Sequence, residues 1–189
     1  MTKKIIRTIF PRKREIVATT LIGLLVSLLI FVTTTFFSPV VAFYGSLLLF
    51  AVGINCLYYL LRKEGLVPLF FVVVGLATRS LDDFGIFGWK KVLVLLLSGL
   101  VFDFLALFFH RQSVDRSPIL TVAFSVACIP GLVVLIISST LTMASLFQIS
   151  NLVFVSFLVG LLTSVVVSLI WFRIRSLKSV IRLEMYLKS

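Results

Sequence analysis

The chain has 189 residues, of which 60% are hydrophobic and only 13% are charged. A soluble domain carries about 25% charged residues on its surface, so this composition excludes an ordinary soluble fold. The formal net charge of +11 would suggest nucleic-acid binding in a soluble protein. In a membrane protein, such charge instead sets the orientation and attracts anionic lipid, and we expect no nucleic-acid partner.

The N-terminal segment is basic and then becomes apolar. Six of the 18 Lys and Arg residues precede residue 15 and alternate with isoleucines and Phe10, which is typical of a short helix on the membrane surface. Residues 16–37 form an uncharged run that is longer than the roughly 7–15 apolar residues of a signal peptide. This length favours a retained first span.

Apolar runs of membrane-spanning length recur along the chain, and they predict six spans. The expected bounds are residues 16–37, 40–61, 65–81, 92–109, 119–140 and 152–172. With both termini in the cytoplasm, this arrangement places 15 Lys and Arg residues inside and three outside. A third run that dips in and returns would give 11 and 7, so the positive-inside rule favours six crossings.

Residues after Trp171 repeat the amphipathic pattern of the N-terminus. An apolar stripe that includes Ile181 and Met185 runs beside Arg175, Lys178 and Arg182. The predicted fold is therefore an all-α integral membrane protein of the cell membrane. Its single polytopic domain is a six-helix bundle with a short amphipathic surface helix at each terminus, facing anionic lipid on the cytoplasmic side.

Small residues recur at every fourth position of the first span, at Thr19, Gly23 and Ser27. This spacing lets two helices approach closely in a membrane, where lipid supplies no hydrophobic drive for association. It is compatible with packing inside the bundle and with docking on a partner subunit. The spacing alone does not distinguish the two.

Two polar residues fall inside the predicted spans. Asp103 lies seven residues from His110, about 10 Å deep at helical rise, and Asn55 lies at a similar depth in the second span. A carboxylate at such a depth normally faces the bundle and finds a partner. We expect Asp103 to form a polar clasp with Asn55 or Thr19, the alternative being a role in ion or proton movement.

The connection between the third and fourth predicted spans, residues 79–91, carries the three basic residues predicted to lie outside: Arg79, Lys90 and Lys91. Asp82, Asp83, Trp89 and Lys90 could frame a polar or zwitterionic ligand there. The alternative is a solvated loop with an aromatic anchor at the interface. Catalysis is not expected: the chain has one histidine, which gives no metal pair, and it has no glycine-rich phosphate loop. We therefore expect no metal and no cofactor.

In its architecture the chain resembles the substrate-binding S-components of energy-coupling factor vitamin transporters. The resemblance covers the length, the six spans, the cytoplasmic termini, the small residues of the first span and the charged outer connection. It implies binding of a small water-soluble nutrient, which is handed on through a membrane coupling subunit with energy from an ATPase. In that family an alanine-spaced face of the first span docks the coupling subunit, and Thr19-xxx-Gly23-xxx-Ser27 is the nearest match here.

Two departures and two alternative functions accompany this resemblance. The chain lacks the alanine pair, and the long first loop of the family is reduced here to about residues 35–39. One alternative is a non-catalytic membrane subunit that assembles or stabilises a partner complex. The other is a membrane-embedded lipid-processing enzyme.

Overall fold

The structure is a computed structural model that describes residues 12–61, 65–111, 117–137 and 143–188. These residues form helices and short connections without a β-strand, which confirms the predicted all-α class. The helices are α2 (Lys13–Phe36), α3 (Pro39–Leu61), α4 (Leu66–Ala77), α5 (Trp89–Arg111), α6 (Ser117–Ile137), α7 (Met143–Ile174) and α8 (Lys178–Lys188). The surface helix predicted at the N-terminus lies largely outside the described residues.

Five of these helices, α2, α3, α5, α6 and α7, are long and apolar enough to cross a membrane, which is compatible with a multi-pass membrane protein. The third predicted span is shorter than expected, because α4 ends at Ala77 instead of residue 81. Its 12 residues reach about 18 Å, less than the roughly 30 Å of a hydrocarbon core. The count of six crossings therefore stays a prediction.

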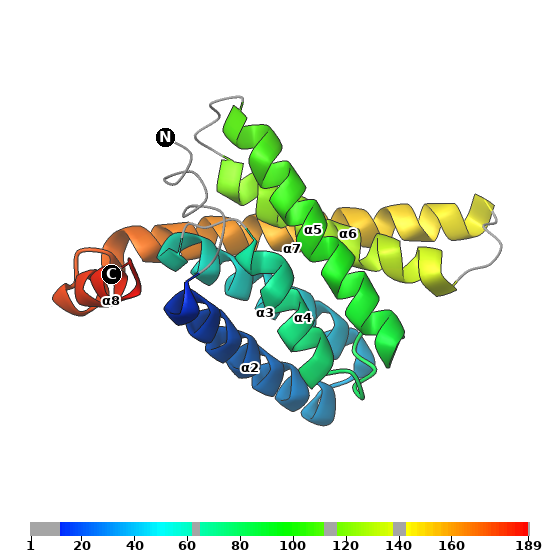
Figure 1. The fold of residues 1–189 in the computed structure, drawn as a ribbon. Coiled ribbons are helices and arrows are strands. Elements are labelled where there is room, and N and C mark those ends of the chain that lie inside the picture. Colours follow the sequence, from blue (N-terminus) through cyan, green and yellow to red (C-terminus); the bar gives the residue numbers. More distant parts are fainter. Residues whose placement is uncertain (1–11, 62–64, 112–116, 138–142, 189) are drawn as a thin grey trace, which may run out of the picture.

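Helix α7 begins at Met143, nine residues before the predicted span at 152–172. The predicted bounds leave residues 141–151 as a connection, but those from Met143 onward are helical. Serine, glutamine and asparagine are only mildly unfavourable in helices, so the backbone continues through them. At 32 residues, α7 is the longest described helix, and Figure 1 shows it extending behind α5 across much of the molecule.

Glycine and proline mark the helix starts. Pro39 is the first residue of α3, where its missing N–H group would have had no helical partner. Gly65 precedes α4 with a positive φ of 83°, a conformation that most side chains disfavour. Pro68 lies in the first turn of α4, where the same missing N–H is tolerated.

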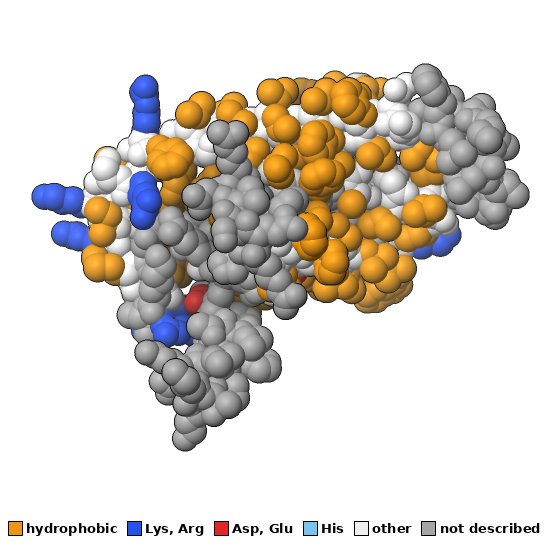
Figure 2. All heavy atoms as spheres, turned by 90° about the horizontal axis from the view of Figure 1, so that it is seen from above, with side chains coloured by type: hydrophobic (Ala, Val, Ile, Leu, Met, Phe, Trp, Pro, Cys, Tyr) orange, Lys and Arg blue, Asp and Glu red, His pale blue; other side chains and the backbone are white. Residues whose placement is uncertain are grey.

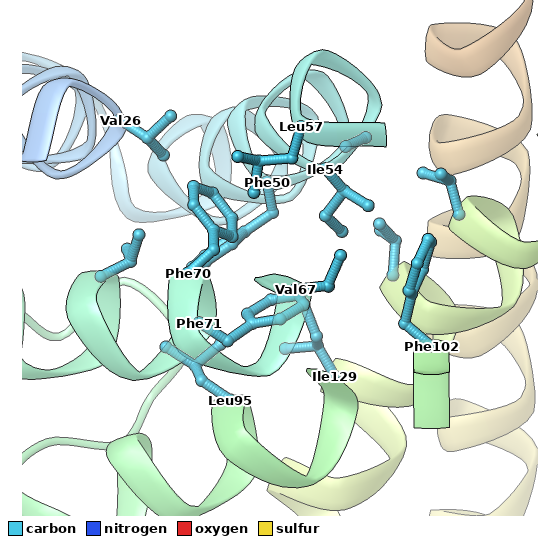
Figure 3. Close-up of a cluster of buried hydrophobic side chains, with 14 of the residues drawn as sticks. Val26, Phe50, Ile54, Leu57, Val67, Phe70, Phe71, Leu95, Phe102 and Ile129 are labelled. Atoms are coloured by element: carbon cyan, nitrogen blue, oxygen red, sulfur yellow. The ribbon is translucent and has the colours of Figure 1, made fainter. Parts of the chain in front are cut away.

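Six helices form a closed ring in which each packs against the next, in the order α3, α2, α4, α5, α6, α7 and back to α3. Aromatic and branched side chains fill the middle of this ring (Figure 3). Phe50 of α3 stacks on Phe71 of α4 with ring centroids 5.2 Å apart, and Phe70 is also fully buried. The core is therefore packed with side chains around α4.

Glycines allow the helices of the ring to approach closely. A β-carbon at Gly99 of α5 would lie 2.7 Å from the Cα atom of Pro68, and one at Gly160 of α7 would lie 2.9 Å from the Cα atom of Ala123. Helix α7 also buries a stripe of small residues at every fourth position that the sequence analysis did not identify: Ser156, Gly160, Ser164 and Ser168. These contacts agree with the use of small residues at membrane-helix crossings.

The small-residue face of α2 packs inside the bundle. Thr19 and Ser27 are buried, and a β-carbon at Gly23 would lie 2.9 Å from Val73 Cγ1 of α4. Of the two interpretations given above, this placement supports internal packing, since a partner subunit could not reach the face without displacing α4. The opposite side of α2 exposes large apolar residues instead, including Leu21, Leu28 and Phe31.

Candidate functional site

Within the described residues, a buried ion pair lies at the start of α5, at the end of the bundle closed by the 78–88 connection. Lys91 is fully buried, although it lies in the first turn of α5. Its Nζ atom donates hydrogen bonds to the carbonyl oxygens of Thr78 at 2.9 Å and Leu81 at 3.2 Å. It also forms an ion pair with the carboxylate of Asp83. All three ammonium protons therefore have an acceptor.

The Asp83 carboxylate is buried as deeply as its partner, with 3% of the residue exposed. Burial raises the pKa of Asp83 above its ordinary value, and the attraction of the Lys91 ammonium ion offsets only part of this effect. The hydroxyl of Ser46, on α3, is close enough to favour the charged carboxylate and lower the pKa slightly. Even so, neither Ser46 Oγ nor Asp83 Oδ2 makes a hydrogen bond of normal geometry within the described residues.

An aromatic ring lies beside this pair and packs against two others. Phe84, the neighbour of Asp83, is 4% exposed and packs edge-on against Phe43 at 5.6 Å between centroids. Its ring also lies 5.8 Å from that of Phe50 and 5.8 Å from Lys91 Nζ. The arrangement is an ion pair and a serine hydroxyl within an apolar wall, where electrostatic and hydrogen-bonding contacts are stronger than in water.

The connection above the pair is held as a compact loop. The Gly88 N–H donates to the Arg79 carbonyl at 2.7 Å, which closes the loop at its base. Gly85 and Gly88 have φ values of 71° and 70°, so each supplies a backbone conformation that other residues rarely adopt. Between them, Ile86 turns inward and Phe87 turns outward, with 4% and 70% of each residue exposed.

The structure separates the four residues predicted to frame a ligand. Asp83 lies inside, whereas Asp82 and Lys90 are exposed and Trp89 is 70% exposed. The buried cation is Lys91 and not Lys90. A pattern in the sequence could have identified it, because Lys91 shares the inward stripe of α5 with Leu95, Ser98 and Phe102, all buried at helical spacing.

Asp103 lies at the opposite end of α4. Its Oδ2 atom accepts a hydrogen bond of 2.9 Å from the backbone N–H of Gly65, the residue that precedes α4. Neither residue predicted to clasp Asp103 is bonded to it: Asn55 donates to Ser164 Oγ of α7 at 3.0 Å, and Thr19 donates to the Glu15 carbonyl. The predicted clasp was wrong because a shared depth does not place residues on facing helices.

Two opposite charges of α5 therefore contact the two ends of α4. Asp103 accepts from the residue before the first turn, and Lys91 donates to carbonyls at and beyond the last turn. The two side chains are twelve residues apart, and α4 is 12 residues long. A negative charge at a helix N-terminus and a positive charge at its C-terminus both complement the helix dipole.

A comparison of the chain with known protein families, curated proteins and solved structures finds no match. The resemblance to S-components therefore stays a prediction.

Proposed function

We propose that this protein binds a small polar solute beneath the 78–88 connection, as the solute-binding membrane subunit of a multi-subunit transporter. The observation that carries the proposal is a pair of neighbouring buried oxygens, Asp83 Oδ2 and Ser46 Oγ, neither of which makes a hydrogen bond of normal geometry among the described residues. A buried polar atom without a partner costs about 1–3 kcal/mol. A solute that donates hydrogen bonds to both would remove that cost.

The surroundings indicate the chemistry of the solute. A carboxylate oxygen only accepts, and a hydroxyl both donates and accepts, so the matching group is an amine, amide or hydroxyl. Phe43, Phe50 and Phe84 supply an apolar wall that suits a flat or ring-shaped body. Entry would require the connection to move, and its two glycines permit a change in backbone angle.

The orientation of the protein follows from charge in this proposal. In the predicted arrangement the protein lies in the cell membrane with both termini in the cytoplasm, and 15 of the 18 Lys and Arg residues are on the cytoplasmic side. The 78–88 connection then faces outward. A solute would then enter from outside. Release to the other side would need energy from partner subunits, as the resemblance to S-components implies.

A second candidate function is a non-catalytic subunit that assembles a partner complex, and one observation favours it. Phe84 and Ile86 fill the space beneath the connection, so the loop itself already covers this end of the bundle. Under this alternative, the Asp83–Lys91 pair only fixes the loop, and the exposed apolar sides of α2 and α7 contact lipid or another subunit.

Native mass spectrometry of the purified protein separates the two candidates. Solute binding predicts a co-purified small molecule on the wild type that is lost from Ser46→Ala, because that change removes one of the two oxygens. The control is Ser27→Ala, since Ser27 is also buried but bonds only its own helix, at the Gly23 carbonyl. A protein without any bound small molecule, or one that Ser46→Ala retains equally, would favour the assembly subunit.

A further inference from the structure

Helix α8 is anchored to the start of α2 at the end of the molecule opposite the 78–88 connection. The Arg14 guanidinium donates to the Tyr186 carbonyl at 3.1 Å and lies 4.5 Å from the centre of the Tyr186 ring. Leu187 is 7% exposed and belongs to the hydrophobic core. One side of α8 is therefore fixed against the bundle, which sets the direction of the other side.

The outward side of α8 combines apolar and basic residues. Ile181 and Met185 are 45% and 59% exposed, and Lys178 and Arg182 are exposed beside them. Arg173 and Arg175, at and just beyond the end of α7, are exposed as well. In Figure 2, several Lys and Arg side chains (blue) lie at the end of the molecule where Figure 1 places α8, and hydrophobic side chains (orange) cover much of the remaining described surface in this view.

We propose that this outward side of α8 binds the headgroups of anionic phospholipids. Lysine and arginine side chains can place their charges at lipid phosphates while neighbouring apolar side chains enter the acyl boundary. Helix α8 itself carries Lys178, Arg182 and Lys188 against one acidic residue, Glu184, so its sequence has a net positive charge. At the start of α2, Glu15 is buried and accepts a hydrogen bond from the Arg12 N–H. The inference does not depend on the solute site.

Charge complementarity favours lipid over a protein partner. Membrane-surface helices carry large apolar residues on one side and Lys or Arg beside them, and bind more strongly as the fraction of anionic lipid rises. The apolar residues here are interleaved with cations and do not form the broad apolar core of a protein interface. Because α8 is already docked on the bundle, lipid binding would not have to order its backbone.

The test compares retention of phosphatidylglycerol and phosphatidylcholine by the detergent-purified full chain, measured by native mass spectrometry. We expect the wild type to retain phosphatidylglycerol preferentially. The double change Lys178→Gln, Arg182→Gln should weaken that retention about thirtyfold, because each basic residue near a membrane surface contributes about 1 kcal/mol, or about fivefold.

The matched control removes two exposed basic residues at the opposite end, with Arg79→Gln and Lys90→Gln. It changes the net charge by the same amount and should retain phosphatidylglycerol like the wild type. Equal retention of the two lipids by the wild type would overturn the proposal. Equal losses in the two double variants would also overturn it, since net charge and not α8 would then hold the lipid.

Discussion

The two ends of α4 contact the same neighbouring helix, α5, but through side chains of opposite charge and different burial. At the C-terminal end, Lys91 is fully buried and Asp83 supplies its counter-charge. At the N-terminal end, Asp103 is only partly buried and accepts from the Gly65 backbone. The depth of an ionisable residue along a helix therefore does not determine its burial, because a folded connection can also bury a charge.

Because the two contacts differ in burial, removing them should lower the unfolding free energy by different amounts. A short helix such as α4 leaves several N–H and C=O groups without partners at each end, and an apolar bundle provides few alternatives. Charged side chains of α5 can satisfy some of these groups. Loss of the buried contact should cost more than loss of the partly buried one, since the atoms left behind cannot reach water.

The largest effect is expected for Lys91→Met. The change leaves the Asp83 carboxylate buried without a partner, which typically costs about 3–5 kcal/mol of unfolding free energy. Titration with SDS of the protein in mild detergent measures this loss. Lys90→Met is the control, because Lys90 directly precedes Lys91 but is exposed, and this change should have little effect on stability.

A second substitution tests whether the loss arises from the unpaired charge. Adding Asp83→Leu to Lys91→Met should recover part of the stability, because it removes the buried carboxylate. If the double variant is as unstable as the sum of the two single variants, the pair is not the source of the effect.

The next effect concerns the crossing between α4 and α5. Gly99→Ala places a β-carbon 2.7 Å from Pro68 Cα, so the backbones must separate, at a cost of about 1–3 kcal/mol. Gly131→Ala is the matched control, since its β-carbon would have its nearest contact at 3.6 Å, with Val153. A melting temperature that falls equally in both variants would contradict this close approach.

The smallest effect is expected at the other end of α4. Asp103→Asn retains an oxygen that can accept from the Gly65 N–H, whereas Asp103→Leu does not. The leucine variant should therefore be less stable than the asparagine variant, by about 0.6 kcal/mol, the average for hydrogen bonds between membrane helices. If the asparagine variant loses function at unchanged stability, a protonatable role for Asp103 replaces the capping role.

The sequence predicted the helical class and the position of most helices, because apolar length determines both. It also contained the information that separates Lys91 from Lys90, since only Lys91 shares the stripe of Leu95 and Phe102. Hydropathy alone does not separate them, because it assigns both lysines to an exposed connection.

The partners of the intramembrane polar residues could not be predicted in the same way. Asn55 and Asp103 lie at similar depths, but the first belongs to the contact between α3 and α7 and the second to the contact between α5 and the start of α4. They are separated because of the order in which the helices are arranged around the ring. A residue pattern along one helix contains no information about that order. The close approach of Gly23 to Val73 has the same origin.

Hydrogen–deuterium exchange, resolved by peptide in detergent or nanodiscs, tests most directly whether α5 holds the two ends of α4 separately. The amides of Leu81 and Gly88 report on the Lys91 end, since both bond within the connection, and the Gly65 amide reports on the Asp103 end. We predict that Lys91→Met accelerates exchange at Leu81 and Gly88 but not at Gly65, and that Asp103→Leu does the reverse. Wild-type exchange at both ends in both variants, or equal acceleration throughout α4, would contradict the account.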